Sequence, residues 1–172
     1  MDSHVVLDRI AAHTHAKALA VASQAAVGDA EAQLGFELPH LLKSIYLSLA
    51  NGGFGPGYGL IGVAGGHSSN LGNLADAYHE IIRGAEYLGL KWPPRLLPFC
   101  EWGDNIFSCV DCSDQKNLVF RSDECKVRPL GYDLQGFFER WLDGVDLLSD
   151  GAVRRRTVEG KNPFTGRKTL FK

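Results

Sequence analysis

The sequence lacks the features that mark secreted, membrane-bound and nucleic-acid-binding proteins. Residues 1–4 have neither the basic segment nor the apolar run of a signal peptide, and no apolar run approaches the roughly 20 residues that span a bilayer. The 18 lysine and arginine residues are outnumbered by 20 acidic residues, so the formal net charge of -2 gives no attraction to phosphate or lipid headgroups. We therefore expect a cytoplasmic protein that binds neither a membrane nor nucleic acid.

Catalytic motifs are also missing. The sequence contains no His-Glu-x-x-His zinc helix, no Gly-x-Ser-x-Gly nucleophile turn and no phosphate-binding loop. The glycine-dense residues 52–59 follow an expected helix rather than a strand, so they lack the context of a nucleotide-binding loop. His67 and Ser68 are neighbours in sequence, but a catalytic pair needs a third group that orients it in space. We therefore expect a protein that is not an enzyme and needs no cofactor.

Cysteine is scarce, and its spacing does not complete a metal site. Cys109 and Cys112 form a Cys-x-x-Cys pair, but the second pair of a zinc ribbon is missing because Cys100 and Cys125 stand alone. Without a secretion signal, these thiols are expected to be reduced. Single cysteines on neighbouring strands are typical small buried hydrophobes, and a zinc site made of all four remains the alternative.

Length and composition favour one domain with a sizeable core. The chain has 172 residues, of which 45% are hydrophobic and 22% are charged, as in ordinary globular proteins. We expect a single domain over residues 1–150 and a basic tail over residues 151–172, which begins with the arginines of residues 154–156. Because the whole chain is mildly acidic, a tail that is solvated or docked on the protein's own acidic surface is favoured over one that binds nucleic acid.

Helical patterns dominate the first half. Leu38, Leu42 and Ile45 recur on one face of a helix that begins at Pro39 and ends at the Asn-Gly-Gly of residues 51–53. Capping and periodicity predict the other helices over residues 4–24, 29–34 (with Asp29 as N-cap and Gly35 as stop), 71–90 and 133–143 (with Asp133 as N-cap).

Strand patterns dominate the second half. Short apolar runs at residues 96–102, 106–111, 117–121 and 125–130 alternate with turn residues, and a shorter run covers residues 59–63. Short strands joined by tight turns are typical of an antiparallel meander. The sequence therefore predicts an α+β fold, a single domain in which an antiparallel β-sheet meander packs against several α-helices.

Two separated motifs carry a family resemblance. The first surrounds the central helix and comprises Glu31, Leu34, Gly35, Leu38, Pro39, Tyr46, Asn51, Gly52 and Gly53. The second surrounds the first turn of the meander and comprises Leu97, Pro98, Phe99, Gly103, Asp104, Asn105 and Asp111. Together they resemble the SUKH superfamily, which includes the yeast cell-wall assembly regulator and many bacterial immunity proteins. The resemblance spans about residues 29–143 and departs from the family pattern at residues 101–102, where a Gly- and Asp-rich approach is common.

The resemblance implies a function in protein binding. A SUKH-like immunity protein would bind a cognate toxin and block its active cleft. If the toxin is a nuclease, its basic substrate groove would match a negative patch formed by the acidic turns. Tyrosine and tryptophan are favoured interface anchors, and acidic residues set rate and specificity. The expected partner contacts are Tyr58, Glu101, Trp102, Asp104, Asp111 and Asp114.

Three alternatives stay open. The acidic residues at the turns are also typical turn formers with solvated side chains. The yeast member of the superfamily implies a regulatory adaptor instead of an immunity protein. Carboxylates gathered at turns would also suit a small metal-dependent enzyme. The sequence gives no indication of the oligomeric state.

Overall fold

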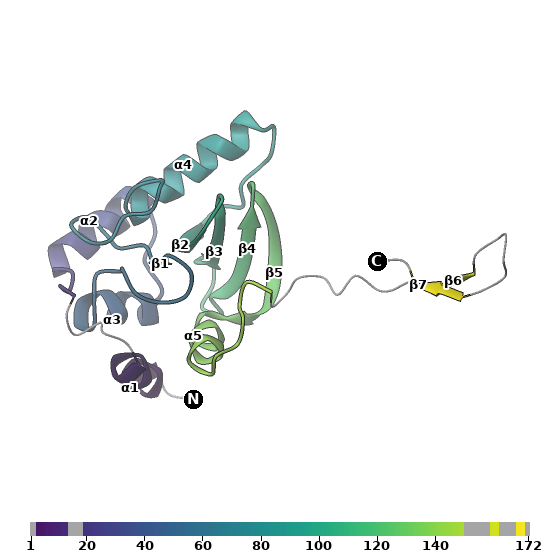
Figure 1. The fold of residues 1–172 in the computed structure, drawn as a ribbon. Helices are drawn as coiled ribbons and strands as arrows, with labels where there is room; N and C mark the ends of the chain where they lie inside the picture. Colours follow the sequence, from purple (N-terminus) through teal and green to yellow (C-terminus); the bar gives the residue numbers. More distant parts are fainter. Residues whose placement is uncertain (1–2, 14–18, 150–158, 162–167, 171–172) are drawn as a thin grey trace.

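A computed structural model describes residues 3–13, 19–149, 159–161 and 168–170 (Figure 1). In these ranges helices come mainly before the sheet strands, and one helix follows them, which confirms the α+β fold. The helices are α1 (Ser3–His13), α2 (Gln24–Leu34), α3 (His40–Ser48), α4 (Leu74–Tyr87) and α5 (Leu134–Leu142). The strands are β1 (Gly59–Leu60), β2 (Leu96–Gly103), β3 (Ile106–Asp111), β4 (Leu118–Asp123), β5 (Lys126–Asp133), β6 (Glu159–Lys161) and β7 (Lys168–Leu170).

The main sheet is the predicted meander. Its strands lie in the order β1-β2-β3-β4-β5, and each pairs antiparallel with its neighbour. Two-residue turns join β2 to β3 and β4 to β5, because Gly103 pairs with Ile106 and Asp123 pairs with Lys126. Since Ile106 also pairs with Asp123, both turns lie at the same end of the sheet.

The first helix is shorter than predicted. It ends at His13, whereas the alanine-rich sequence predicted a helix to about residue 24. Beyond residues 14–18, the chain runs alongside the end of α3. There Ala22 donates its N–H to the carbonyl of Tyr46 at 2.8 Å, and Asn51 donates its N–H to the carbonyl of Ala20 at 2.8 Å. These bonds to a distant segment override the local helical propensity of alanine.

Two other helix starts differ from the prediction. Helix α2 begins after Ser23, whose hydroxyl accepts the N–H of Ala26 at 3.0 Å, and not at Asp29. Helix α4 begins after Asn73 rather than at Leu71, because the Asn73 side chain and Asp76 form a reciprocal capping box. Gly35, with φ of 76°, ends α2 as predicted.

The core joins α3 and α5 to the sheet. Helix α3 is amphipathic as predicted, and the hydroxyl of its fully buried Tyr46 donates to the carbonyl of Ile61 at 2.6 Å. On α5, the ring of Phe137 packs edge-to-face against Phe99 of β2, with centroids 4.9 Å apart. Helices α1 and α5 lie together in Figure 1, where Arg9 forms an ion pair of 2.6 Å with Asp143.

None of the helices that the structure describes is long and apolar enough to cross a membrane. In the tail, β6 and β7 pair with each other antiparallel. The arginines of residues 154–156 and the rest of residues 150–158 lie outside the described residues. The domain boundary at residue 150 and the placement of the basic tail therefore stay predictions.

Candidate functional site

Asn51, from the first motif, is a structural residue. It is buried, and its side-chain oxygen accepts the N–H of Val63 at 2.9 Å while its amide donates to the carbonyls of Val63 at 3.3 Å and Ala64 at 3.5 Å. Its backbone carbonyl accepts the N–H of His67 at 3.0 Å. Asn51 therefore ties the end of α3 to the loop that precedes α4.

Close packing requires glycine at three positions between residues 52 and 66. A Cβ on Gly62 would lie 2.7 Å from the Asn51 Oδ1, and one on Gly66 would lie 2.5 Å from the Asn51 Nδ2. A Cβ on Gly52 would lie 2.6 Å from the carbonyl oxygen of Leu60. Neighbouring backbone and side-chain atoms occupy the space that a side chain would need at these positions.

Three of the predicted contact residues lie together around the β2–β3 turn. Tyr58 is 68% exposed, its N–H donates to the carbonyl of Glu101 at 2.8 Å, and its ring lies against Gly103, where a Cβ would be 2.6 Å from Tyr58 Cε2. Trp102 is half-buried, and Asp104 is exposed in the turn itself. We call Tyr58, Trp102 and Asp104 the turn surface.

The indole of Trp102 is held in place by its neighbours. Its Nε1 donates to the hydroxyl of Ser108 at 2.9 Å, and the guanidinium of Arg121 lies 5.9 Å from the centre of its ring. Trp102 is thus a fixed, half-buried aromatic side chain, and it directly precedes Gly103, against which the Tyr58 ring lies. Fixed aromatic side chains lose little conformational entropy when they bind a partner.

Glu101 lies beneath this surface. Its side chain is buried, and its carboxylate accepts the N–H of Asn70 at 3.4 Å. Asn70 in turn donates to the side chain of Asn105 in the β2–β3 turn at 3.4 Å. Glu101 therefore positions the loop that borders the turn surface, rather than presenting a charge to solvent.

Asp111 and Asp114 lie at the opposite end of β3. A strand of this length spans about 20 Å, so they are far from Asp104. The carboxylate of Asp111 accepts the N–H of Ser113 at 2.8 Å, and that of Asp114 accepts the N–H of Lys116 at 2.8 Å. Both residues form turns, which is the alternative interpretation of these acids.

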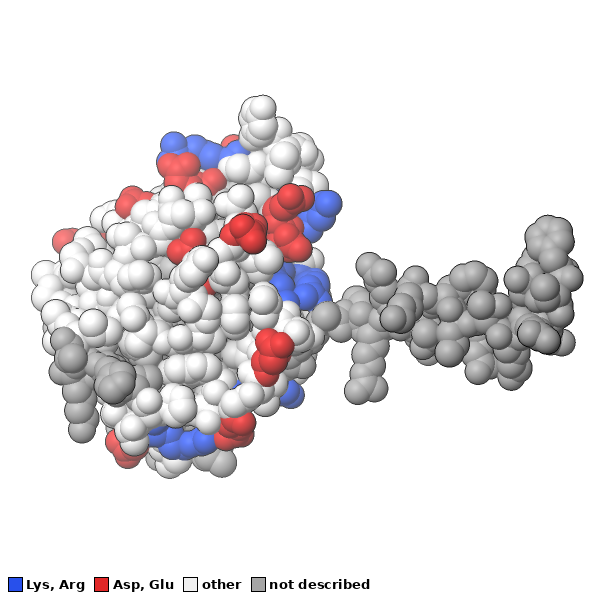
Figure 2. Space-filling model, in the orientation of Figure 1, with Lys and Arg blue, Asp and Glu red and all other residues white. Residues whose placement is uncertain are grey.

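The acidic turns therefore do not all contribute to one negative patch. The six expected contact residues are divided between the two ends of the sheet, and Glu101 is buried. Figure 2 shows that charged side chains of both signs are dispersed over the face it presents. The reason is topological, because successive turns of a meander alternate between opposite ends of the sheet.

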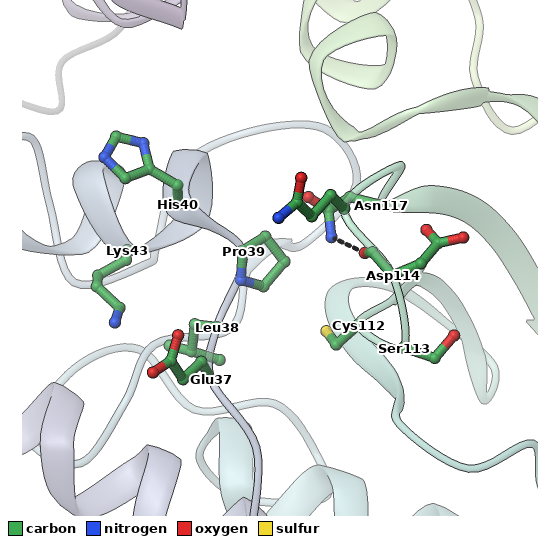
Figure 3. A pocket seen from close by; sticks show the side chains of 10 residues that line it. Glu37, Leu38, Pro39, His40, Lys43, Cys112, Ser113, Asp114 and Asn117 are labelled. Carbon is green, nitrogen blue, oxygen red and sulfur yellow. Dashed lines mark hydrogen bonds between the residues drawn. The ribbon is translucent and has the colours of Figure 1, made fainter.

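A groove of about 570 Å³ lies beside Asp114, between the start of α3 and the β3–β4 loop (Figure 3). In this view the side chains of His40 and Lys43 lie across the groove from Asp114. Lys43 pairs with Glu31 at 2.7 Å, and Glu31 also accepts the N–H of Leu38 at 2.8 Å. Glu31 of the first motif thus holds the chain that leads into α3, and the polar groups of the groove do not converge on one point.

The cysteines pack in or against the core, two of them buried and two half-buried. All four are free thiols, and Cys100 and Cys109 are buried. Burial raises the pKa of the Cys112 thiol to about 12 and raises the pKa of the other three thiols as well. Across the described ranges, no group of three or more His, Cys, Asp or Glu side chains is placed to hold a metal ion.

The raised thiol pKa values predict a loss of stability in alkali. The unfolded thiols ionise near pH 8.5, whereas the Cys112 thiol stays protonated in the folded state until about pH 12. The stabilisation of the folded state that comes from this protonated thiol is fully present below pH 8.5 and is lost as the pH rises toward 12. Each buried thiol lowers the free energy of unfolding by up to about 1.4 kcal/mol per pH unit in this window.

Urea unfolding between pH 7 and pH 10 tests this prediction. The Cys112→Ser variant should show a shallower decline above pH 8.5 than the parent chain. Equal slopes in the two proteins would contradict the assignment of Cys112 as a buried, protonated thiol.

A second groove, of about 400 Å³, was not predicted from the sequence. It lies between α4 and the two turns of the sheet. Its lining includes Gly84 and Tyr87 of α4, Leu88 directly after the helix, and Asn105 and Glu124 of the turns. Two features of the sequence could have indicated it: Gly84 inside the predicted helix, and the apolar residues Tyr87 and Leu88 near the end of that helix. Neither signal reveals a groove without the position of the opposite turn.

Comparison with known families gives one result that covers most of the domain. The model of the SMI1 / KNR4 family (SUKH-1) matches residues 21–140. This range includes α2, α3, α4 and the whole five-stranded sheet. The comparison with curated proteins found no match.

Proposed function

Because the chain belongs to the SMI1 / KNR4 family (SUKH-1), we propose that it is a non-enzymatic binding protein of the immunity type. It binds a cognate toxin and neutralises the toxin by covering its active cleft. The observation that carries the proposal is the exposed Tyr58 ring, which lies against Gly103 of the β2–β3 hairpin, directly before the exposed Asp104 in the chain. The protein acts in the cytoplasm, where it meets a toxin that has entered or remained in the cell.

The turn surface has the composition of an interface anchor. Tyrosine and tryptophan are enriched among residues that dominate binding energy, because they bury a large area with few rotatable bonds. A backbone hydrogen bond to β2 fixes Tyr58, and the bond to Ser108 fixes Trp102. A partner would therefore meet a preorganised surface.

Asp104 supplies the negative charge on this surface. A carboxylate at the rim of an interface speeds association with a basic partner and disfavours an acidic one. A toxin with a basic substrate groove, such as a nuclease, fits this requirement. Glu124 of the β4–β5 turn lies at the same end of the sheet and adds a second negative charge there.

Recovery of the partner tests the function. The tagged full-length chain is used as bait in its native cell, and each recovered protein is then expressed alone and together with the chain. We expect a partner whose C-terminal domain stops growth when expressed alone and whose co-expression with the chain restores growth. Recovery of only cytosolic signalling or cell-wall enzymes, with no effect on growth, would instead support the regulatory adaptor.

Substitutions in the turn surface test where the partner binds. We expect Tyr58→Ala to weaken partner binding at least about 30-fold, the effect of a hot-spot residue. Asp104→Lys should slow association and reduce its dependence on salt. Surface plasmon resonance at 50 mM and 300 mM salt would measure both effects.

Asp114→Lys is the matched control. It makes the same charge change in an exposed turn at the opposite end of the sheet. If Asp114→Lys slowed association as much as Asp104→Lys, the turn surface would not be the contact site.

A further inference from the structure

The groove beside α4 combines an apolar floor with exposed apolar residues at its edge. Ile81 and Phe107 are buried at its base. At its edge, Tyr87 is 91% exposed and Leu88 is 54% exposed. We call this site the α4 groove. Large apolar side chains gathered at a concave site are typical of surfaces that bind another protein.

The turn that forms one wall of the α4 groove is built from unfavourable residues. Glu124 and Cys125 have φ of 47° and 62°, in the left-handed region that a two-residue hairpin turn requires. Asparagine and glycine occupy such positions with less strain, as Asn105 does in the neighbouring turn. Glu124 and Cys125 are therefore not the residues that turn geometry alone would favour, and such strain is found where side chains serve binding.

The charge of the α4 groove has one sign. Its lining includes the carboxylates of Glu80 and Glu124, and no lysine or arginine of the described residues lines it. Glu80 forms an exposed ion pair of 2.5 Å with Arg83, and Glu124 projects from the turn in an exposed position. A positive group at the edge of the groove would complement Glu124.

We propose that the α4 groove binds a basic segment of a partner protein, which inserts one aliphatic side chain flanked by lysine or arginine. The aliphatic side chain contacts Ile81, Phe107 and Leu88, and the flanking positive charge pairs with Glu124. Asn105 links this groove to the turn surface, because it lines the groove and directly follows Asp104. The proposal rests on the binding function proposed above, and it names a second anchor for the same partner.

A tripeptide probe tests the α4 groove without the partner. Acetyl-Arg-Leu-Lys-amide is titrated into the ¹⁵N-labelled full-length chain, and the backbone amides of Gly84, Leu88, Asn105 and Cys125 are followed by NMR. We expect saturable shifts confined to the groove, with a Kd on the order of 0.1–1 mM. Acetyl-Glu-Leu-Glu-amide should bind at least about tenfold more weakly, and acetyl-Arg-Gly-Lys-amide should show the same loss.

Two variants of Gly84 distinguish loss of the groove from loss of the fold. A Cβ on Gly84 would make only an ordinary contact, 3.7 Å from the Cys125 sulfur, so α4 accepts a side chain there. Gly84→Leu should fill the groove and abolish the shifts, whereas Gly84→Ala should keep the groove and retain binding. Equal binding by Gly84→Leu and the parent chain would overturn the proposal.

Relaxing the turn separates binding from stability. The Glu124→Asn variant places a favourable residue at the first left-handed position and keeps Cys125, whose thiol packs against α4, so Tm should rise by about 1–2 °C. The same variant should weaken tripeptide binding about tenfold, because it removes the Glu124 carboxylate. Unchanged binding in this more stable protein would overturn the role of Glu124.

Other occupants give different results. If groove shifts depend on protein concentration without peptide, a second copy of the chain occupies the groove and the proposal is wrong. If Arg154→Glu moves the groove amides without peptide, the chain's own tail is the occupant and the proposal is again wrong. Because the titration reports on the groove and growth rescue reports on toxin neutralisation, either idea can fail separately.

Discussion

Gly62→Ala is expected to destabilise the fold by at least about 3 kcal/mol, which is a large part of the stability of a typical domain. The new Cβ would lie 2.7 Å from the Asn51 Oδ1, 2.9 Å from the His67 N and nearer still to the Asn51 carbonyl oxygen. Both backbone groups are hydrogen-bonded to each other, so neither can move away without breaking that bond. The segment around Gly62 would therefore have to move away from Asn51, and the packing between the end of α3 and the loop before α4 would be lost.

Gly28→Ala is the matched control for this prediction. Gly28 is exposed inside α2, and a Cβ there would meet nothing within 4 Å. Alanine should therefore stabilise the protein by about 0.5–1 kcal/mol through helix propensity. Urea unfolding would measure both variants. Equal midpoints for Gly62→Ala and the parent chain would contradict the close packing around Asn51.

Asn51→Ala is expected to cost about 2–4 kcal/mol. The substitution leaves the N–H of the fully buried Val63 without its acceptor. The carbonyl of Val63 loses the Asn51 amide but keeps the N–H of Gly66 as a donor, at 2.9 Å. A buried polar group that loses its partner costs more than an average hydrogen bond contributes. The loop that carries Asn70, and with it the border of the turn surface, should also become mobile.

Asn70→Ala tests whether the loss of stability expected for Asn51→Ala depends on the burial of the side chain. Asn70 is exposed, and its side chain forms one long hydrogen bond, of 3.4 Å, to Asn105. Its substitution should change the free energy of unfolding by less than about 0.5 kcal/mol. Thermal unfolding of the two variants would measure the difference. Similar melting temperatures for both variants would contradict the structural role assigned to Asn51.

The meander and the amphipathic helices could be predicted because their signals are local. Turn residues at 103–105 and 122–124 mark the ends of strands whose pairing partners are the next strands in the chain. The end of α1 and the start of α2 could not be predicted, because the backbone partners of Ala20 and Ala22 lie at the end of α3, about 25–30 residues away. Local propensity carries no information about such partners.

The candidate site was only partly predictable. Tyr58 and Asp104 are both exposed, and the Tyr58 ring lies against Gly103, the residue before Asp104. The burial of Glu101 depends on the loop of Asn70 covering it, and the separation of Asp111 from Asp104 depends on which end of β3 each residue occupies. The α4 groove depends on the distance between α4 and a distant turn. Each of these features is set by tertiary structure.

The order of the strands also has a consequence for how the chain folds. From β2 to β5, each strand pairs with the next one along the chain. Closing such short loops loses little entropy, so these hairpins should form early. Strand β1 should instead pair later, because Gly59 pairs with Glu101 and all of α4 lies between these two residues in the sequence. Amide exchange during refolding should therefore protect residues 106–130 before residues 59–63, so the turn surface, which needs Tyr58, is completed late.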